Sequence, residues 1–384
     1  EIRSFIPKRT IKMIFQTLSN YFKAIESLNS KFYSVPYEEI TEMGVFQRFR
    51  LYDFSFETLI MILLATMALI FSFGRGQNTK ITNRIFFPLN DFMYLQFANI
   101  GFTYKMKRIP YLSEFHNTLV TGFYTGRKNV ESVEVKLHLS SRFNPLGLLM
   151  EKLMKNALSG IMEDNLEEFV EINIKPNNRS TEYKPSKSED TTQLFEHQTR
   201  ESLPKKYQFV AGIVAKHAMT SSRKKYYYLN TVPLVETVRL PKEYVFMTEN
   251  NTISNGIFFN NNQDNKELEE LLEKSKNILK SFTITDLPDD QPILDTDFDK
   301  SSSRIHIVLK TPKTIKEVDA MIDLIKYGLS IYDNLTAGTF DKIFMNPNLL
   351  KKLDHLRKVE KDRVLKVMKE VEQEMKKKEL QSKK

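Results

Sequence analysis

"TLIMILLATMALIFSFG", residues 58–74, is the stretch on which the fold depends, because it holds seventeen residues and no charged side chain. Nine of the seventeen are Leu, Ile or Phe, and at about −0.3 to −0.6 kcal/mol each they favour membrane insertion by roughly 3–5 kcal/mol. A helix that crosses a bilayer needs about 17–25 residues. The stretch therefore predicts a transmembrane helix over residues 58–74. A buried core helix is the alternative, although such a helix usually keeps a polar stripe and this stretch has none.

Basic residues near the two ends of the span indicate which side of the membrane holds the bulk of the chain. Arg75, Lys80 and Arg84 follow the span, whereas Arg48 and Arg50 precede it. The side with more Lys and Arg close to a span tends to be cytosolic, and acidic residues count little. Three basic residues against two favour a cytosolic location for the long C-terminal part and a lumenal location for the part before the span.

The composition of the whole chain limits the classes of protein to which it can belong. The 384 residues carry a formal charge of +9 and are 41% hydrophobic, which is enough for one membrane anchor and one or two folded domains. The positive charge indicates an anionic partner, either nucleic acid or acidic lipid headgroups. The chain has no cysteine, which excludes a disulfide framework and cysteine-based zinc or redox sites.

Two segments flank the span. Residues 1–57 are predicted to form a short region with an amphipathic helix, whose apolar stripe would face either lipid or a protein core. That stripe consists of Ile11, Phe15, Leu18, Phe22, Ile25 and Leu28. Residues 75–117 are rich in Phe, and Pro88 and Asn90 are expected to interrupt them. We interpret residues 75–117 as a juxtamembrane segment that lies at the membrane interface or docks on a domain.

Residues 118–345 alternate between strand and helix patterns. Val133, Val135, Leu137 and Leu139 alternate with polar residues, which is typical of a half-buried strand. Similar alternation marks residues 170–174 and 304–310, and long amphipathic patterns mark helices over residues 266–280 and 314–335. We therefore expect an α+β protein: a single transmembrane helix, a mixed α/β cytosolic domain over residues 118–345, and a C-terminal helix.

The last segment, residues 346–384, is predicted to be one long basic helix of the coiled-coil type. From Leu349 to Lys384 it holds thirteen Lys or Arg and seven Asp or Glu. Its apolar stripe is lean, and the run "EKDR" at 360–363 is expected to break the register. RNA and a second helix are both possible partners for such a segment, and a solvated tail is the third alternative.

Two groups of basic residues are the candidate sites for binding RNA on a ribosome. The first is Arg223, Lys224 and Lys225, beside three tyrosines at 226–228 whose rings could stack on bases. The alternative for this group is a solvated helix end over core tyrosines. The second group lies in the C-terminal helix and comprises Arg357, Lys358, Lys361, Arg363, Lys366, Lys369, Lys376, Lys377 and Lys378.

The sequence contains no recognisable catalytic constellation. Its six histidines are scattered, with no pair at metal-ligand spacing, and His138 and His306 are expected to pack within strands. The acidic run at residues 286–299 lacks the spacing of a calcium-binding loop. We therefore expect a protein that is not an enzyme and that holds no cofactor and no metal.

The order of several motifs gives a family resemblance. The span precedes "YTGRKNVESVEVKLHLSSRFNPLGLLMEKLMK", and then follow "LPKEYVFMTENNTISNGIF", "ITDLPDDQPIL", "RIHIVLKTP" and the long basic helix. Over residues 56–384 this pattern resembles the calumin family, also called coiled-coil domain-containing protein 47. The motifs are hydrophobic and glycine positions rather than a catalytic fingerprint.

The resemblance implies a single-pass membrane protein of the endoplasmic reticulum, with a cytosolic α/β domain. It implies membership of the PAT complex in the multipass translocon, where it would assist the insertion of multi-spanning proteins. The implied partners are the ribosome through rRNA near the tunnel exit, the translocon with small membrane subunits, nascent multi-spanning proteins and lipid of the endoplasmic reticulum membrane. Animal members carry a long acidic lumenal region linked to calcium, which residues 1–57 lack, so calcium binding is not carried over. A membrane-anchored lipid-handling or contact-site tether protein is the alternative function.

Overall fold

The structure is a computed structural model that describes residues 32, 34–104, 107–115, 117–144, 147–148, 167–177, 208–237, 239–259, 266–292, 302–337, 339–340 and 347–382. The predicted amphipathic helix within residues 1–57 has its stripe at 11–28, outside the described residues. The chain divides into two compact units, Glu1–Phe73 and Gly74–Lys384. Residues 75–117, expected as a separate juxtamembrane segment, belong to the second unit.

The described part of the first unit consists of helices. Helix α3 covers Tyr37–Glu42, helix α4 covers Val45–Leu51, and helix α5 begins at Ser55. The expected span at 58–74 lies inside α5, which contains an 18-residue window of mean hydropathy 2.2 that is not buried at all. Among the described residues, α5 is the one helix long and apolar enough to cross a membrane.

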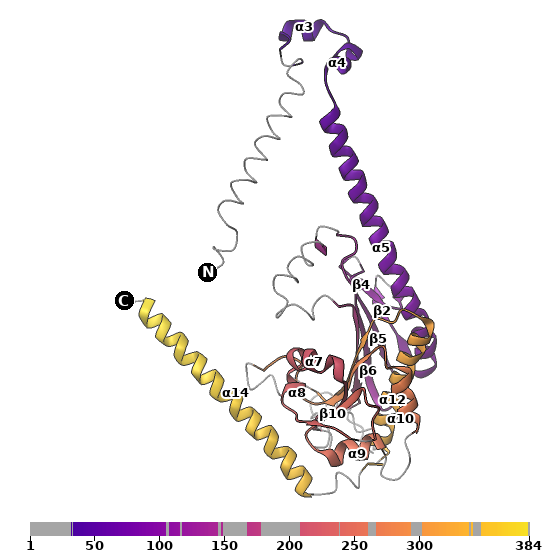
Figure 1. Ribbon diagram of the computed structural model, residues 1–384, viewed down its shortest axis with the longest axis vertical. Coiled ribbons are helices and arrows are strands. Elements are labelled where there is room, and N and C mark those ends of the chain that lie inside the picture. The colour runs from indigo at the N-terminus through magenta and orange to yellow at the C-terminus, as the bar shows by residue number, and fades with distance from the viewer. Residues whose placement is uncertain are drawn as a thin grey trace, which may run out of the picture. The chain divides into compact units, whose positions relative to one another are not determined.

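Helix α5 is longer than the expected span, because it continues without a break to Gln96 (Figure 1). Pro88, expected to interrupt this region, lies inside the helix. A proline removes one backbone hydrogen bond and destabilises a helix by about 3 kcal/mol. Here tertiary packing offsets that cost, because Ile85, Phe86 and Leu89 around the proline are fully buried. This part of the Phe-rich segment therefore docks on the folded domain, which is one of the two interpretations given above for residues 75–117.

The second unit is built on an antiparallel sheet of ten strands in the order β1-β5-β6-β7-β12-β11-β8-β10-β9, with β4 paired to β5 (Figure 1). The strands are β1 Asn99–Ile100, β4 Leu112–Glu114, β5 Leu119–Thr125, β6 Val130–His138, β7 Phe169–Pro176, β8 Ala211–Ala215, β9 Leu234–Val235, β10 Tyr244–Thr248, β11 Leu279–Thr285 and β12 Arg304–Lys310. Strands β2 Phe102–Tyr104 and β3 Lys107–Ile109 form a separate hairpin. The mixture of helices with an antiparallel sheet confirms the α+β class.

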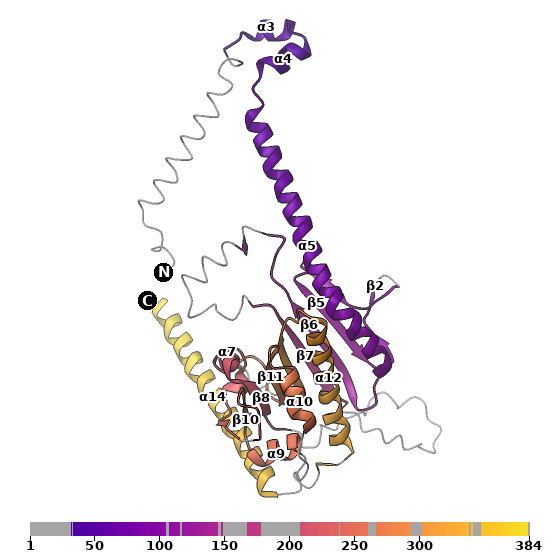
Figure 2. The same ribbon diagram turned by 45° about the vertical axis from the view of Figure 1, so that its right-hand side comes forward.

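Helices lie on both faces of this sheet, as Figure 2 shows. Successive side chains of a strand point to opposite faces, so the buried residues of each central strand divide between two cores. In β10, Tyr244 and Phe246 join the larger core, whereas Val245 and Met247 join the smaller one. The larger core is covered by the second half of α5 and by α9 Asn251–Phe259, α10 Lys266–Lys274 and α12 Ile315–Thr336. The smaller core is covered by α7 Met219–Lys225, α8 Tyr227–Asn230 and α14 Pro347–Ser382. The buried Ala218 of the 3-10 helix η2 Lys216–Ala218 belongs to the larger core.

The expected C-terminal helix is present as α14, a helix of 36 residues. The run at 360–363, expected to break the register, lies inside this helix without interruption. Leu349 and Leu353 near its start are buried in the larger core, and Val364 is buried in the smaller one. The first half of α14 is therefore part of the folded domain rather than a tail separate from it.

Candidate nucleic-acid interface

The first half of α14 is attached to the domain at a site built by two strand ends. Strands β10 and β11 both pair antiparallel with β8. They therefore run in the same direction, and their C-terminal ends lie on the same side of the sheet. Glu249 follows the last residue of β10, and Asp286 follows the last residue of β11. The topology thus places two carboxylates near each other, and α14 crosses the C-terminal ends of these two strands.

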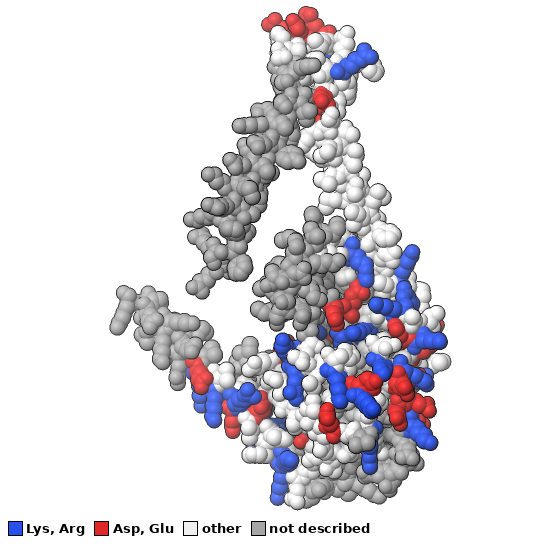
Figure 3. All heavy atoms as spheres, in the orientation of Figure 1, with Lys and Arg blue, Asp and Glu red and all other residues white. Residues whose placement is uncertain are grey.

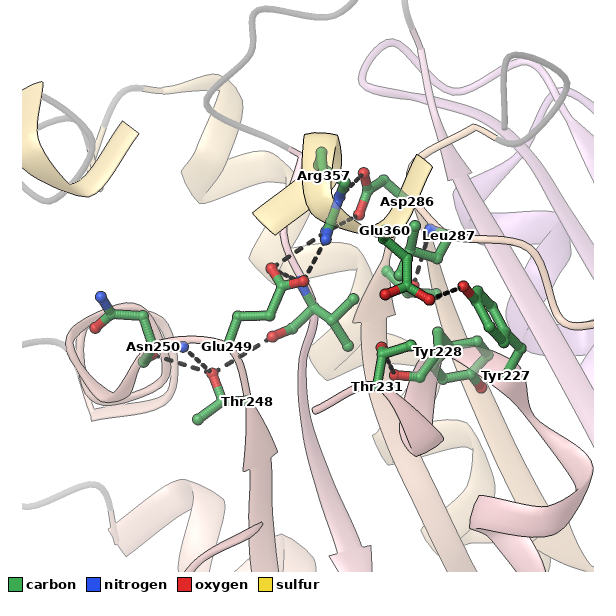
Figure 4. Close-up of polar contacts among 12 residues, drawn as sticks. Tyr227, Tyr228, Thr231, Thr248, Glu249, Asn250, Asp286, Leu287, Arg357 and Glu360 are labelled. Carbon is green, nitrogen blue, oxygen red and sulfur yellow. Dashed lines mark hydrogen bonds and ion pairs between the residues drawn. The ribbon is translucent and has the colours of Figure 1, made fainter. Parts of the chain in front are cut away.

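Arg357 of α14 binds both carboxylates (Figure 4). Its Nε and Nη2 donate to the two oxygens of Asp286 at 2.9 and 2.6 Å, which makes the ion pair bidentate. Its Nη1 and Nη2 also donate to Glu249. The side chains of Arg357 and Glu249 are only 16% and 6% exposed. Arg357, one of the candidate RNA-binding residues, therefore faces the domain and serves as an anchor of α14.

The charges of this cluster do not balance, since one guanidinium meets two carboxylates. Burial raises the pKa of Glu249, and the neighbouring Asp286 adds to this, although Arg357 and the backbone N–H of Val210 act against it. Burial opposes the charged form of Arg357, but the two carboxylates outweigh burial and raise its pKa. Arg357 is therefore charged in the folded protein at any physiological pH.

A second contact places the two candidate groups next to each other. The hydroxyl of Tyr227, two residues after Lys225, donates to the carboxylate of Glu360 on α14 (Figure 4). Tyr226 and Tyr228 are buried in the smaller core together with Val364. These two rings are thus unavailable for stacking on bases, which corrects that expectation and agrees with the core-tyrosine alternative.

The structure distributes the three basic residues of α7 unequally. Arg223 is half-buried, and its Nη2 donates to the carbonyl oxygen of Val232 at 3.2 Å. Lys224 is exposed. Lys225 is also exposed, and its ammonium group lies 3.8 Å from the ring centre of Phe169. Two cations of α7 therefore face solvent beside α14.

The candidate cations of α14 lie mainly on its outward side. Lys358, Arg363, Lys366 and Lys369 are exposed, whereas Lys361 is half-buried. Lys358 and Lys369 are eleven residues apart, about three turns, so they lie on one stripe opposite the docked residues. Figure 3 shows Lys and Arg atoms on this side of α14, with acidic atoms between them. Lys376, Lys377 and Lys378 belong to α14, but their side chains lie outside the described part. We call Lys224, Lys225, Lys358, Lys366 and Lys369 the basic face.

The structure also locates part of the acidic run at 286–299. Asp286 binds Arg357, and Asp289 binds Arg304 at 2.7 Å, so two of its carboxylates form ion pairs. Residues 293–301 lie outside the described residues. Within the described ranges, no group of three or more acidic or histidine side chains has an arrangement that could hold a metal ion.

One buried polar cluster was not recognised in the sequence. His306, on β12, is fully buried between the hydroxyl of Tyr228 at 2.5 Å and the carboxylate of Glu171 at 2.8 Å. The signal available in the sequence was that His306 and Glu171 alternate with apolar residues on their strands, which places both on the face of the smaller core. The expectation that His306 packs within a strand holds, but its two polar partners come from elsewhere in the fold: Glu171 from the pairing of β7 with β12, and Tyr228 from α8.

The sequence was also compared with known proteins. The family model described as PAT complex subunit CCDC47 matches residues 53–384. The UPF0674 endoplasmic reticulum membrane protein YNR021W of Saccharomyces cerevisiae is 29% identical over 371 residues, covering 94% of this chain and 88% of the relative. The UPF0674 endoplasmic reticulum membrane protein C2G5.01 of Schizosaccharomyces pombe is 24% identical over 333 residues, covering 85% of this chain and 79% of the relative. The family is described as a complex subunit and not as an enzyme. Because the model matches almost the whole chain, the chain belongs to the PAT complex subunit CCDC47 family.

Proposed function

We propose that this protein is a non-enzymatic, ribosome- and translocon-associated factor of the endoplasmic reticulum membrane that assists the insertion of multi-spanning membrane proteins. In this proposal the first half of α5 crosses the membrane once, and Gly74–Lys384 is cytosolic. Its partners are the ribosome, through rRNA near the tunnel exit, the translocon with other membrane subunits of the PAT complex, nascent multi-spanning proteins and membrane lipid.

The observation that carries the proposal is that the lysines of the basic face are exposed on a helix that is fixed to the folded domain. Arg357 and Tyr227 hold the first half of α14 against the domain, while Lys358, Lys366 and Lys369 remain exposed on the other side. Cations on a fixed helix can bind phosphates without first losing the conformational entropy of a mobile tail. Phosphate contacts of this kind give affinity and position without reading a base sequence. That property suits a protein that docks on one site of a large ribonucleoprotein.

The membrane part of the proposal is supported by α5 and by the relatives. No residue in the apolar window of α5 is buried in the chain by itself, and an exposed stretch of this kind needs an apolar surrounding. The two fungal relatives are named endoplasmic reticulum membrane proteins and match along most of their lengths. Family membership in turn supports a place beside other subunits of the PAT complex.

Salt-dependent sedimentation of ribosomes tests this proposal. Membranes that contain the protein are solubilised in mild detergent, and ribosomes are pelleted in low salt and in high salt. We expect the protein in the ribosome pellet in low salt and in the supernatant in high salt, because each phosphate contact releases counterions. Recovery in the supernatant under both conditions would refute ribosome docking.

A lipid-handling or tethering function is the second candidate, and one observation favours it. Phe87, Tyr94 and Leu95 are exposed on the second half of α5, in the Phe-rich segment. Neighbouring rings of the same segment, Phe86 and Phe97, are instead buried in the larger core. The same sedimentation experiment separates the two candidates, because a lipid tether does not migrate with ribosomes.

A further inference from the structure

Helix α4 carries one of the most exposed groups of apolar side chains in the described chain. Phe49 lies four residues after Val45 and three after Phe46, so these three side chains lie on one side of the helix, and Phe46 is 91% exposed. Arg48 and Arg50 lie between and beyond them, so the short helix has apolar and basic sides. Water does not favour so much exposed aromatic surface, and some apolar surrounding must cover it.

Hydrogen bonds hold the connection between α3 and α4 in a defined conformation. Arg48 donates from Nε to the carbonyl oxygen of Met43 and from Nη2 to that of Thr41, both at 2.9 Å, and so caps the end of α3. At the start of α4, the backbone N–H of Gly44 donates to the side-chain oxygen of Gln47 at 3.2 Å, and the backbone N–H of Gln47 donates to the carbonyl oxygen of Gly44 at 2.9 Å. The two helices therefore form a defined elbow.

Aromatic packing continues from this elbow to the start of α5. The rings of Phe49 and Phe54 stack with centres 5.5 Å apart, and Tyr52 packs edge-on against Phe54 at 4.6 Å. Ser55 then begins α5. Tyrosine is enriched at membrane–water interfaces, and phenylalanine is common on the apolar face of helices that lie in the interface.

The length of the uncharged stretch also indicates where the membrane boundary lies. Between Glu57 and Arg75 there are seventeen residues, which as a helix span about 26 Å. The hydrocarbon core of a bilayer is about 30 Å thick. The stretch alone is slightly too short, so residues just before it must lie at the boundary if α5 crosses. Figure 3 shows the middle of α5 free of charged atoms, and acidic atoms over α3.

We propose that α4 lies within the headgroup region of the leaflet at the N-terminal end of the span. Val45, Phe46 and Phe49 point to the acyl chains, and Arg50 lies among the phosphates. Helix α3, with Glu38 and Glu39 in its first turn, remains in water. The elbow then fixes the depth of the span and prevents it from sliding toward the opposite leaflet. This inference rests on the proposed function in one respect only, namely that α5 crosses the bilayer.

The absence of tryptophan from the chain allows a direct test with single-tryptophan variants. Phe46→Trp is purified as the full chain and reconstituted alone into phosphatidylcholine vesicles, with and without lipid brominated at a shallow acyl position. We expect blue-shifted emission that is strongly quenched by the brominated lipid. Met67→Trp, inside the apolar stretch, is the control for the span. Tyr37→Trp, 80% exposed on α3, is the control for solvent and should be neither shifted nor quenched.

The three variants separate the possible outcomes. Quenching at positions 46 and 67, but not at 37, supports the inference. Quenching at 67 without quenching at 46 leaves the span intact and overturns the inference. If position 46 is blue-shifted but not quenched, protein covers α4 instead of lipid, and the inference is again wrong. If neither 46 nor 67 is quenched, the span fails, and the inference fails with it.

Discussion

Nε2 of His306 lies 2.8 Å from the carboxylate of Glu171, and these two side chains join the neighbouring strands β12 and β7 on the face of the smaller core. On its other side, Nδ1 of His306 lies 2.5 Å from the hydroxyl of Tyr228. An ionised carboxylate only accepts, so Nε2 of His306 donates to Glu171, and a tyrosine hydroxyl, which can donate and accept, is the partner of Nδ1. The fully buried histidine thus has a partner for each ring nitrogen.

Glu171 should make the stability of the second unit depend on pH. Burial acts to raise the pKa of Glu171, but the contacts with the imidazoles of His138 at 3.7 Å and His306 at 2.8 Å and the charge of Lys225 outweigh burial and hold this pKa well below its usual range. A depressed carboxyl pKa contributes stability that is present above the ordinary value of 4.5 and is lost as pH falls below it. We expect Glu171→Gln to destabilise the protein by about 1.5–3 kcal/mol at neutral pH. Denaturation measured by tyrosine fluorescence should show this difference shrinking below pH 4.5. A difference that stays constant down to pH 3 would show that the charge of Glu171 is not involved.

Gly74 and Gly76 form a matched pair within α5. A Cβ on Gly74 would collide with the backbone carbonyl of Arg142, whereas a Cβ on Gly76 would meet nothing within 4 Å. We expect Gly74→Ala to destabilise the protein, because neither backbone can move without disturbing the buried Asn78 and its bond to Ser140. Gly76→Ala should instead be neutral or stabilising by up to about 1 kcal/mol, since alanine is the better helix former. Thermal denaturation of the two variants checks this. Equal effects would mean that the crossing of residues 140–143 over α5 is loose.

The anchor of α14 can be tested by comparing two arginines of that helix. Arg357→Ala leaves Glu249 and Asp286 buried without their cation, which should cost about 3–5 kcal/mol. Arg363 is 69% exposed and lies 3.7 Å from Glu360, so Arg363→Ala should change stability by at most about 0.5 kcal/mol. Limited proteolysis of the folded protein should cut α14 rapidly in the Arg357 variant and slowly in the other. Equal resistance to protease would show that Arg357 does not hold the helix.

The span and its orientation have their own test. We expect the protein to stay in the membrane pellet after alkaline carbonate, and the double variant Leu64→Arg, Met67→Arg to be released. Each arginine at the centre of a span costs about 2.5–3.5 kcal/mol, which together cancel the insertion energy. Protease added to intact microsomes should digest residues 85–384 and protect a small N-terminal fragment. Glycan on Asn178, Asn250 or Asn334 would show that the second unit is lumenal and would contradict ribosome docking.

Local patterns in the sequence were sufficient to predict where helices and strands lie, but not where each one ends. The uncharged stretch at 58–74, the alternation in β6 and the capped helix α12 were all visible, because burial on one face imposes a period of two or of about 3.6 residues. The continuation of α5 through Pro88 was not visible, since it depends on packing against strands far along the chain. A local helix-breaking preference gave way to tertiary contacts there.

The candidate site shows the same division. The sequence identified the basic residues of α7 and α14, and the structure places these two groups next to each other. The sequence could not indicate that Arg357 is buried in an ion pair while Lys358 is exposed. The partners of Arg357, Glu249 and Asp286, follow strands that lie more than seventy residues earlier in the chain. Only the parallel direction of β10 and β11 within the antiparallel sheet places those carboxylates together.

Charge reversal on the basic face tests ribosome docking most directly. In the test variant Lys358, Lys366 and Lys369 are changed to Glu, and in the control variant the exposed Lys242, Lys274 and Lys316 are changed to Glu, so both lose the same charge. Glutamate is about as good a helix former as lysine, so α14 should still form. We predict that the test variant stays in the membrane after carbonate but no longer pellets with ribosomes in low salt, whereas the control variant pellets as the wild type does. Wild-type pelleting of the test variant, or equal loss in both variants, would contradict a ribosome-binding role for the basic face.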